Sequence, residues 1–186
     1  MALTESYMLP LQTKAPPFLL PNVVSGSVET LDQLKGSTGT LVVFMCNHCP
    51  YVVHLLDALL ATAKEFAQKG VNTIGISSNS ILSHPQDGPD EMKKLALEKN
   101  FPFPYLYDET QEVAHAYNAA CTPDFFLFDE NKSLVYRGRL DDSRPGNDKP
   151  LTGKDLRAAI DALLSLQPIS SVQYPSGGCN IKWKDS

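Results

Sequence analysis

The segment TLVVFMCNHCP, residues 40–50, is the feature that most constrains how this chain can fold. Residues 40–45 are uniformly apolar and rich in β-branched side chains, which predicts a central strand covered on both faces. Pro50 fits the first turn of a helix, where its missing N–H is tolerated, and apolar residues recur at helical spacing from Val52 to Phe66. These residues therefore predict a buried strand that leads through a C-x-x-C-P sequence into a helix.

The rest of the chain continues this alternation of strands and helices. Residues 14–36 are predicted to form a small hairpin and a helical turn, as an N-terminal arm. Further elements are expected as strands at 71–78 and 103–108, a hairpin of 125–129 with 134–138, and helices at 88–100, 108–117 (capped by Asp108 with Gln111) and 152–166. The pattern is that of an α/β fold with a central mixed β-sheet and helices on both faces. We assign residues 1–168 to one domain with its arm, and 169–186 to a C-terminal tail carrying Cys179.

Composition narrows the classes of function. A net charge of −5 and a pI near 5.3 leave no basic face for phosphates, so nucleic acid is not an expected partner. No apolar run reaches the ~20 residues that a bilayer crossing needs, and the first residues lack the pattern of an export signal. We expect a cytoplasmic protein without a membrane partner, in which the four cysteines are reduced rather than joined in a disulfide framework.

Cys46 and Cys49 are the candidate redox pair. A strand that enters a helix at C-x-x-C-P predicts Cys46 in the first turn, where free N–H groups and the helix dipole favour a thiolate. Cys46 would then attack a disulfide, and Cys49 would resolve the mixed disulfide. His48, between them, either assists the thiolate or is a solvent-facing residue. No role is assigned to His54, His84 or His115.

Two other interpretations of the cysteine pair exist. A closed zinc site takes four ligands, commonly from two knuckles, and no second C-x-x-C is present; Cys121 and Cys179 could join only singly. Two inert buried thiols would not explain a proline directly after the second cysteine. We therefore expect no bound metal and no organic cofactor.

Several segments together carry a family resemblance. They are APPFLLPN, FMCNHCPYV, PYLYDETQEVAHAY, CTPDFFLFD, YRGRLDDSRPGND and GGCNIKWK. Over nearly the whole chain they resemble the peroxiredoxin-like proteins of the thioredoxin superfamily, in the alkyl hydroperoxide reductase and thiol-specific antioxidant group. The resemblance implies a thioredoxin-like fold with Thr122-Pro123 as its cis-proline loop, which packs against the redox pair and offers backbone groups to an extended substrate.

The resemblance leaves the other two cysteines open. Cys121, next to the loop, is either a small buried residue or an accessory redox group. Cys179 is either a mobile thiol that resolves or caps the site, or a tail residue held by the packing of Ile181 and Trp183.

The chain also departs from its relatives. Peroxiredoxins place a Ser or Thr three residues before the reactive cysteine, whereas Val43 precedes Cys46, and Cys46 precedes Cys49, at that spacing. Our first hypothesis is a thiol-disulfide oxidoreductase acting on a disulfide-containing protein or a small thiol substrate, with an external thiol reductant. A thiol peroxidase and a Cu(I)- or zinc-binding thioredoxin-fold protein are the alternatives.

A charged loop follows the hairpin. Residues 137–148 combine Arg137, Arg139 and Arg144 with Asp141, Asp142 and Asp148, which predicts ion pairs on a solvated surface. The other interpretation is that one arginine faces the active site and favours the thiolate.

Overall fold

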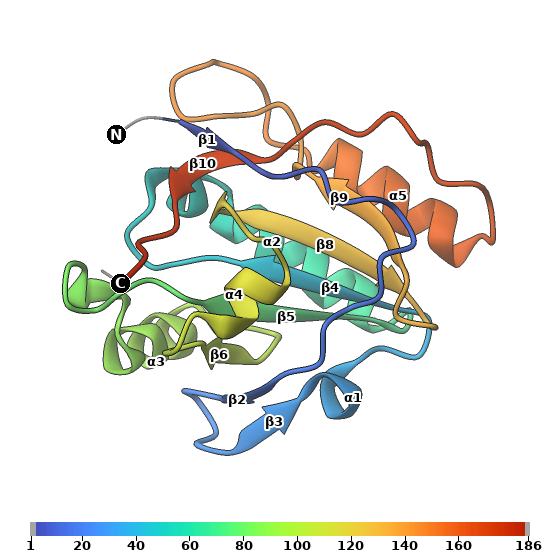
Figure 1. Ribbon diagram of the computed structural model, residues 1–186. Helices are drawn as coiled ribbons and strands as arrows, with labels where there is room; N and C mark the ends of the chain where they lie inside the picture. Colours follow the sequence, from blue (N-terminus) through green and yellow to red (C-terminus); the bar gives the residue numbers. More distant parts are fainter. Residues whose placement is uncertain (1–2, 185–186) are drawn as a thin grey trace.

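The computed structural model describes residues 3–184, and a five-stranded mixed sheet lies at its centre (Figure 1). The strand order is β6-β5-β4-β8-β9. The strands are β4 (Gly39–Phe44), β5 (Val71–Ser77), β6 (Tyr105–Tyr107), β8 (Asp124–Asp129) and β9 (Leu134–Gly138). Strands β4, β5 and β6 are parallel, whereas β8 is antiparallel to both β4 and β9. Every residue of β4 is buried, which confirms the predicted central strand.

Side chains of β4 alternate between two apolar clusters, one on each face of the sheet. Leu41 and Val43 pack with helices α2 (Pro50–Ala67), α3 (Pro89–Glu98) and α5 (Lys154–Leu164). Val42 and Phe44 pack with the N-terminal arm and with α4 (Glu112–Ala116), which cross the other face in Figure 1. The thioredoxin-like layering predicted from the sequence, with helices on both faces of a mixed sheet, is confirmed.

The N-terminal arm also forms as predicted. Strands β2 (Leu19–Pro21) and β3 (Val28–Thr30) make an antiparallel hairpin that leads into the short helix α1 (Leu31–Leu34). Thr30 caps this helix: its hydroxyl accepts the Gln33 N–H, and the Gln33 side chain accepts the Thr30 N–H. The capping box therefore fixes the point at which β3 ends and α1 begins.

A second, three-stranded sheet joins both ends of the described chain, and the sequence did not predict it. Strand β10 (Gly177–Asn180) lies between β1 (Thr4–Glu5) and β7 (Cys121–Thr122), antiparallel to both. In Figure 1 the blue β1 and the red β10 run side by side. The C-terminal tail is therefore part of the folded structure through this strand.

The predicted start of the fourth helix is wrong. It begins at Glu112 rather than at Asp108, because Gln111 has a left-handed backbone (φ 66°) that interrupts the turn. The Asp108 side chain still serves the helix from a distance, since its carboxylate accepts the Ala114 N–H at 2.9 Å. The other predicted helices and strands agree within a few residues at their ends.

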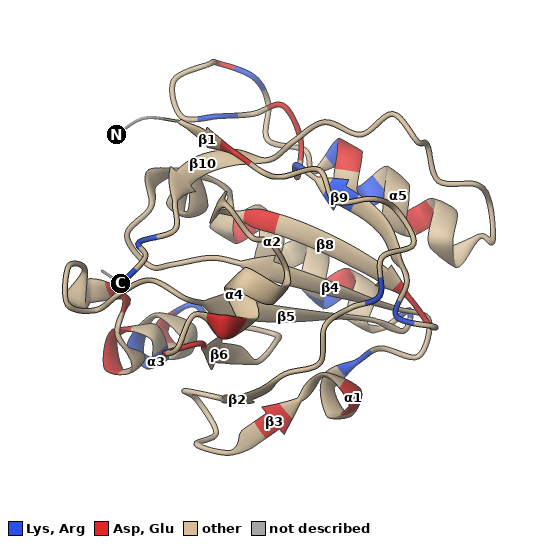
Figure 2. Cartoon of the chain, in the orientation of Figure 1, with Lys and Arg blue, Asp and Glu red and all other residues tan. Residues whose placement is uncertain are grey.

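Acidic and basic residues are both scattered over the helices and loops (Figure 2). The loop after β9 follows this pattern, with Arg139 paired to Asp155 and both Lys149 and Lys154 paired to Asp142. No helix in the described part of the chain is long and apolar enough to cross a bilayer.

Candidate active site

The candidate redox pair, Cys46 and Cys49, lies at the carboxyl end of β4, but its relation to α2 differs from the prediction. The helix begins at Pro50 and Cys49 is its N-cap residue, with an extended backbone (φ −65°, ψ 122°). Cys46 stands three residues earlier, so its placement in the first helical turn is wrong. The loop does not join the helix because Pro50 disfavours helical geometry for the residue before it. The N–H groups of Asn47 and His48 donate instead to Asp87 Oδ1 at 2.9 and 3.3 Å.

Of the two cysteines, Cys49 has the lowered pKa and Cys46 the raised one. The neighbouring Cys46 thiol is the main cause that lowers the pKa of Cys49, and the Cys179 thiol, with its Sγ 2.8 Å away, adds to it. Cys49 in turn raises the pKa of Cys46, as do burial and the nearby Asp87 carboxylate. Cys49 also lies at the N-terminus of α2, where the helix dipole favours an anion.

The two cysteines are enclosed. The exposed fraction is 1% for Cys46 and 0% for Cys49, and all four cysteines are free thiols. Because a substrate sulfur must reach one of these atoms, exchange with a bound disulfide requires a local opening of the structure around the pair.

Thr122 contacts both thiols of the pair. Its hydroxyl lies 3.5 Å from Cys46 Sγ, and its carbonyl oxygen accepts a hydrogen bond from the protonated Cys49 thiol at 3.2 Å. The bond from Thr122 to Pro123 is cis. The structure thus brings Cys46, Cys49, Thr122 and Pro123, the central predicted site residues, into one place.

His48 lies beside Cys46, with 3.8 Å between Nδ1 and Sγ. Its Nδ1 also donates to Asp87 Oδ2 at 2.6 Å, and its ring stacks on that of His84 at 4.8 Å between centroids. Nε2 is buried and has no hydrogen-bond partner in the described part of the chain. The His48 ring is therefore held beside Cys46 by Asp87 and His84 rather than facing solvent. The sequence had suggested no role for His84.

Sequence reasoning missed Asp87 and Asn79. Asp87 is fully buried and accepts four hydrogen bonds, from the Asn47 and His48 backbone, from the His48 ring and from Asn79 Nδ2 at 2.8 Å. One signal was present: β5 runs parallel to β4, so polar residues after β5 must lie at the same edge of the sheet as the cysteines. Asp87 fixes the loop between the two cysteines.

A group of potential metal ligands coincides with this network. Cys46 Sγ, His48 Nδ1 and an Asp87 oxygen lie within 4.8 Å of one another. However, the His48 atom in this group is the one that donates to Asp87 at 2.6 Å, so its hydrogen bond already accounts for the arrangement. The group supplies three ligands, whereas a closed zinc site takes four.

The other two cysteines have different surroundings. The Cys121 thiol donates to the Pro123 carbonyl oxygen at 3.6 Å, and burial together with the Asp124 carboxylate raises its pKa. Cys121 therefore has the environment of an inert buried thiol. Cys179 lies on β10 with its Sγ only 2.8 Å from Cys49 Sγ.

The arginines of the charged loop bind away from the pair. Arg137 donates to the Leu9 carbonyl and to Gln173, and Arg144 donates to the carbonyls of Asp141 and Ser143. Of these three arginines only Arg139 makes an ion pair within the described chain, with Asp155 of α5, so the surface-pairing interpretation holds for one of them. Of the histidines without an assigned role, His54 bonds Ser143 and His115 stacks on Trp183.

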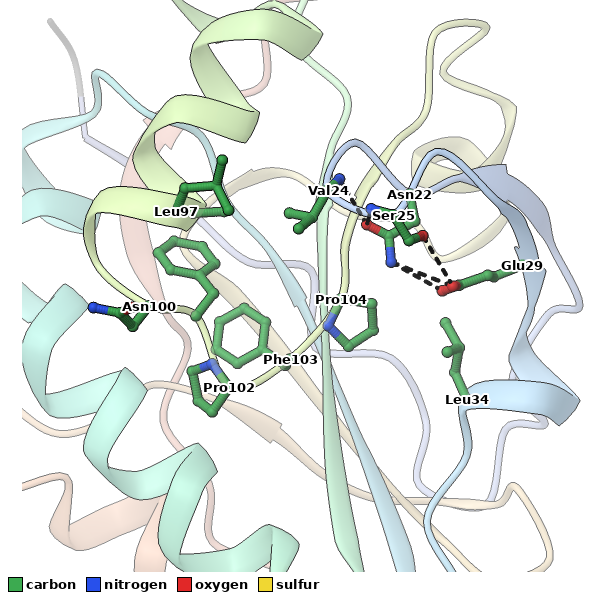
Figure 3. Close-up of a pocket in the computed structure, with 12 residues that line it drawn as sticks. Asn22, Val24, Ser25, Glu29, Leu34, Leu97, Asn100, Pro102, Phe103 and Pro104 are labelled. Carbon is green, nitrogen blue, oxygen red and sulfur yellow. Dashed lines mark hydrogen bonds between the residues drawn. The ribbon is translucent and has the colours of Figure 1, made fainter.

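A groove of about 570 Å³ lies elsewhere, between the β2–β3 hairpin and the connection from α3 to β6 (Figure 3). Phe103, Pro102 and Pro104 line one side, and Glu29, hydrogen-bonded to Asn22, lines the other. No cysteine lines it. The redox pair and this groove are therefore separate features.

Comparison with known proteins identifies the family. The model of the AhpC/TSA family matches residues 11–137. The chain belongs to this family. Peroxiredoxin 2 of Thermoplasma acidophilum is 30% identical over 125 residues, which are 67% of this chain but only 57% of that relative. The crystal structure of an uncharacterized conserved protein of Geobacillus kaustophilus is 53% identical, with a TM-score of 0.98, and covers 100% of this chain and 98% of that one.

The thioredoxin fold is shown by more distant structures. The thioredoxin domain of a thiol-disulfide oxidoreductase of Bacteroides vulgatus matches with a TM-score of 0.59 at 22% identity, over 73% of this chain and 90% of that one. The chain is thus a thioredoxin-fold member of a peroxiredoxin-like redox family.

Proposed function

We propose that this protein is a thiol-disulfide oxidoreductase that cycles Cys46 and Cys49 between dithiol and disulfide. The observation that carries the proposal is geometric: Cys49 lies at the N-cap of α2, three residues after Cys46, and both thiols contact Thr122 of the cis-proline loop. The lowered pKa of the Cys49 thiol supports it. A thiolate with a thiol in contact is the arrangement that disulfide exchange needs.

The proposed reaction has two exchange steps. The Cys49 thiolate attacks one sulfur of a substrate disulfide; that bond breaks and the departing thiolate takes up a proton. Cys46 then loses its proton and attacks Cys49 Sγ, which forms the Cys46–Cys49 disulfide and releases the second substrate thiol. The substrate gains two electrons, and an external thiol reductant restores the pair. The roles of the two cysteines are reversed relative to those expected from the sequence.

The substrate class follows from the enclosure of the pair. Because both sulfurs are buried, a small thiol or disulfide reaches them with the least displacement of the surrounding protein. An extended protein segment would require a neighbouring strand to move away from the cysteines. We propose a cytoplasmic setting, because reduced thiols are the resting state that this cycle needs.

A redox titration tests the proposal. We expect wild-type protein in glutathione buffers of graded ratio, quenched with acid and alkylated, to show one two-electron transition that removes Cys46 and Cys49 together from labelling. Cys121→Ser serves as the matched control and should titrate identically. If both thiols stay open to labelling at every ratio while the protein remains folded, the proposal is wrong.

A thiol peroxidase is the second candidate, favoured by the family and by the similarity to a peroxiredoxin. Against it, Cys46 occupies the place three residues before Cys49 where peroxiredoxins have a hydroxyl. In addition, the main groups that lower the pKa of Cys49 in the described structure include no Lys or Arg. Stopped-flow mixing with hydrogen peroxide separates the two: we expect oxidation no faster than that of free cysteine, and a much faster rate would favour the peroxidase.

A further inference from the structure

Cys179 meets the redox pair through a strand of the protein's own tail. Strand β10 pairs with β7 so that Cys179 lies opposite Thr122, directly before the cis-proline. Its Sγ is 2.8 Å from Cys49 Sγ, and the residue is 2% exposed. Cys49 therefore has the Cys179 thiol in contact, in addition to Cys46 three residues before it in its own loop.

This contact depends on a glycine in β10. A Cβ on Gly178 would lie 1.9 Å from the Thr122 carbonyl oxygen and 2.7 Å from its carbonyl carbon, so only glycine allows β10 to lie this close. At the preceding glycine, Gly177, an added Cβ would lie 3.1 Å from a carbon of the Leu3 side chain, which can move. The close approach is specific to the position next to Cys179.

The tail on the far side of Cys179 is anchored as well. The Ile181 N–H donates to the Ala120 carbonyl, and the Lys182 N–H donates to Asn79 Oδ1 at 2.8 Å. Asn79 in turn donates to Asp87, which holds the loop between Cys46 and Cys49. Cys179 is thus fixed in the same hydrogen-bonded network as the redox loop, which supports a held tail over a mobile one.

We propose that Cys179 is a third exchange thiol, so that Cys49 alternates between two disulfide partners, Cys46 and Cys179. This inference rests on the proposed function. When Cys49 carries a substrate sulfur or is bonded to Cys46, the Cys179 sulfur gives up its proton and attacks Cys49 Sγ. The Cys49–Cys179 bond forms, the previous bond breaks, and the departing sulfur takes up a proton. Between the two internal disulfides no electrons are gained or lost.

The electrostatics of the three thiols fit this order of events. Burial raises the pKa of Cys179 to about 12, and both the hydrogen bond and the charge of Cys49 contribute to that rise. The two contributions from Cys49 disappear once its sulfur is in a disulfide, because a disulfide sulfur carries no charge. Cys179 is therefore held as a thiol while Cys49 is the nucleophile, and becomes easier to ionise when it is needed.

The test uses glutathione disulfide on two variants that both lack Cys46 and Cys121. In Cys46→Ser/Cys121→Ser protein we expect glutathione to leave and an internal bond between Cys49 and Cys179 to form, identified by peptide mass mapping. In the variant that also carries Cys179→Ser, the glutathione adduct on Cys49 should persist at least about tenfold longer. Circular dichroism checks that both proteins are folded.

Equal adduct lifetimes in the two variants, without a Cys49–Cys179 peptide, would overturn the inference. A variant that carries only Cys179→Ser distinguishes failure of the third-thiol inference from failure of the proposed function. If it still forms the Cys46–Cys49 disulfide, the proposed function stands and only the third thiol is rejected. If it forms none, the redox pair itself is rejected.

Discussion

Cys49→Ser is expected to lower turnover by at least about 10³-fold, because this substitution removes the nucleophile itself. A serine hydroxyl at the N-cap of α2 stays protonated near neutral pH and does not attack a disulfide. Turnover is measured as reduction of glutathione disulfide or insulin with dithiothreitol as donor. The free energy of unfolding should change far less than the rate, since serine is a natural helix cap.

Cys121→Ser is the matched control for this experiment. It replaces a buried cysteine in the same part of the molecule, next to the cis-proline loop, whose thiol bonds only carbonyl oxygens. We expect its turnover to stay near that of the wild type. A Cys49→Ser protein that retains a tenth or more of wild-type turnover would be incompatible with Cys49 as the attacking sulfur.

The largest expected effect on stability concerns Asp124. This carboxyl is buried at the start of β8, with Oδ2 accepting the Ala120 N–H at 3.1 Å and Oδ1 without a partner in the described structure. Burial raises the pKa of Asp124 to about 8. In the unfolded chain the carboxyl ionises near its ordinary pKa of about 4. The folded state therefore binds one more proton than the unfolded state between these two values.

The sign of the pH dependence follows from this proton. Above pH 4 the unfolded chain gains from ionising Asp124 and the folded protein does not, so the free energy of unfolding falls by up to about 1.4 kcal/mol per pH unit until pH 8. In Asp124→Asn that slope should disappear, because the amide does not titrate.

Urea unfolding at pH 5, 6, 7 and 8 measures how the free energy of unfolding changes with pH. Asp129→Asn, at the other end of β8, removes one carboxylate without this burial and serves as the control. Equal slopes for Asp124→Asn and the wild type would contradict the assignment.

The sequence predicted the parts of the fold that depend on local pattern. The uniformly apolar residues 40–45 predicted a strand buried on both faces, and β4 is one. The helical spacing after Pro50 likewise predicted α2. These predictions succeed because the periodicity of apolar residues records directly which faces are buried.

What the sequence did not reveal depends on contacts between distant segments. Cys179 reaches Cys49 across 130 positions of the chain, through a strand too short and too rich in glycine to show a β pattern. Asp87 reaches the loop of Cys46 only because β5 and β4 are neighbours. Which of the two cysteines ionises more easily also depends on such a contact, since Asp87 is one of the groups that raise the pKa of Cys46.

The most direct test of this site is the pH dependence of alkylation of each thiol in the reduced wild-type protein. Limited reaction with iodoacetamide, followed by fragmentation of the peptide that contains both cysteines, reports which sulfur reacts first. We expect the first label on Cys49, with a rate that rises through a pKa below the value of about 8.5 for a free cysteine. A first label on Cys46 with such a depressed pKa would contradict Cys49 as the thiolate.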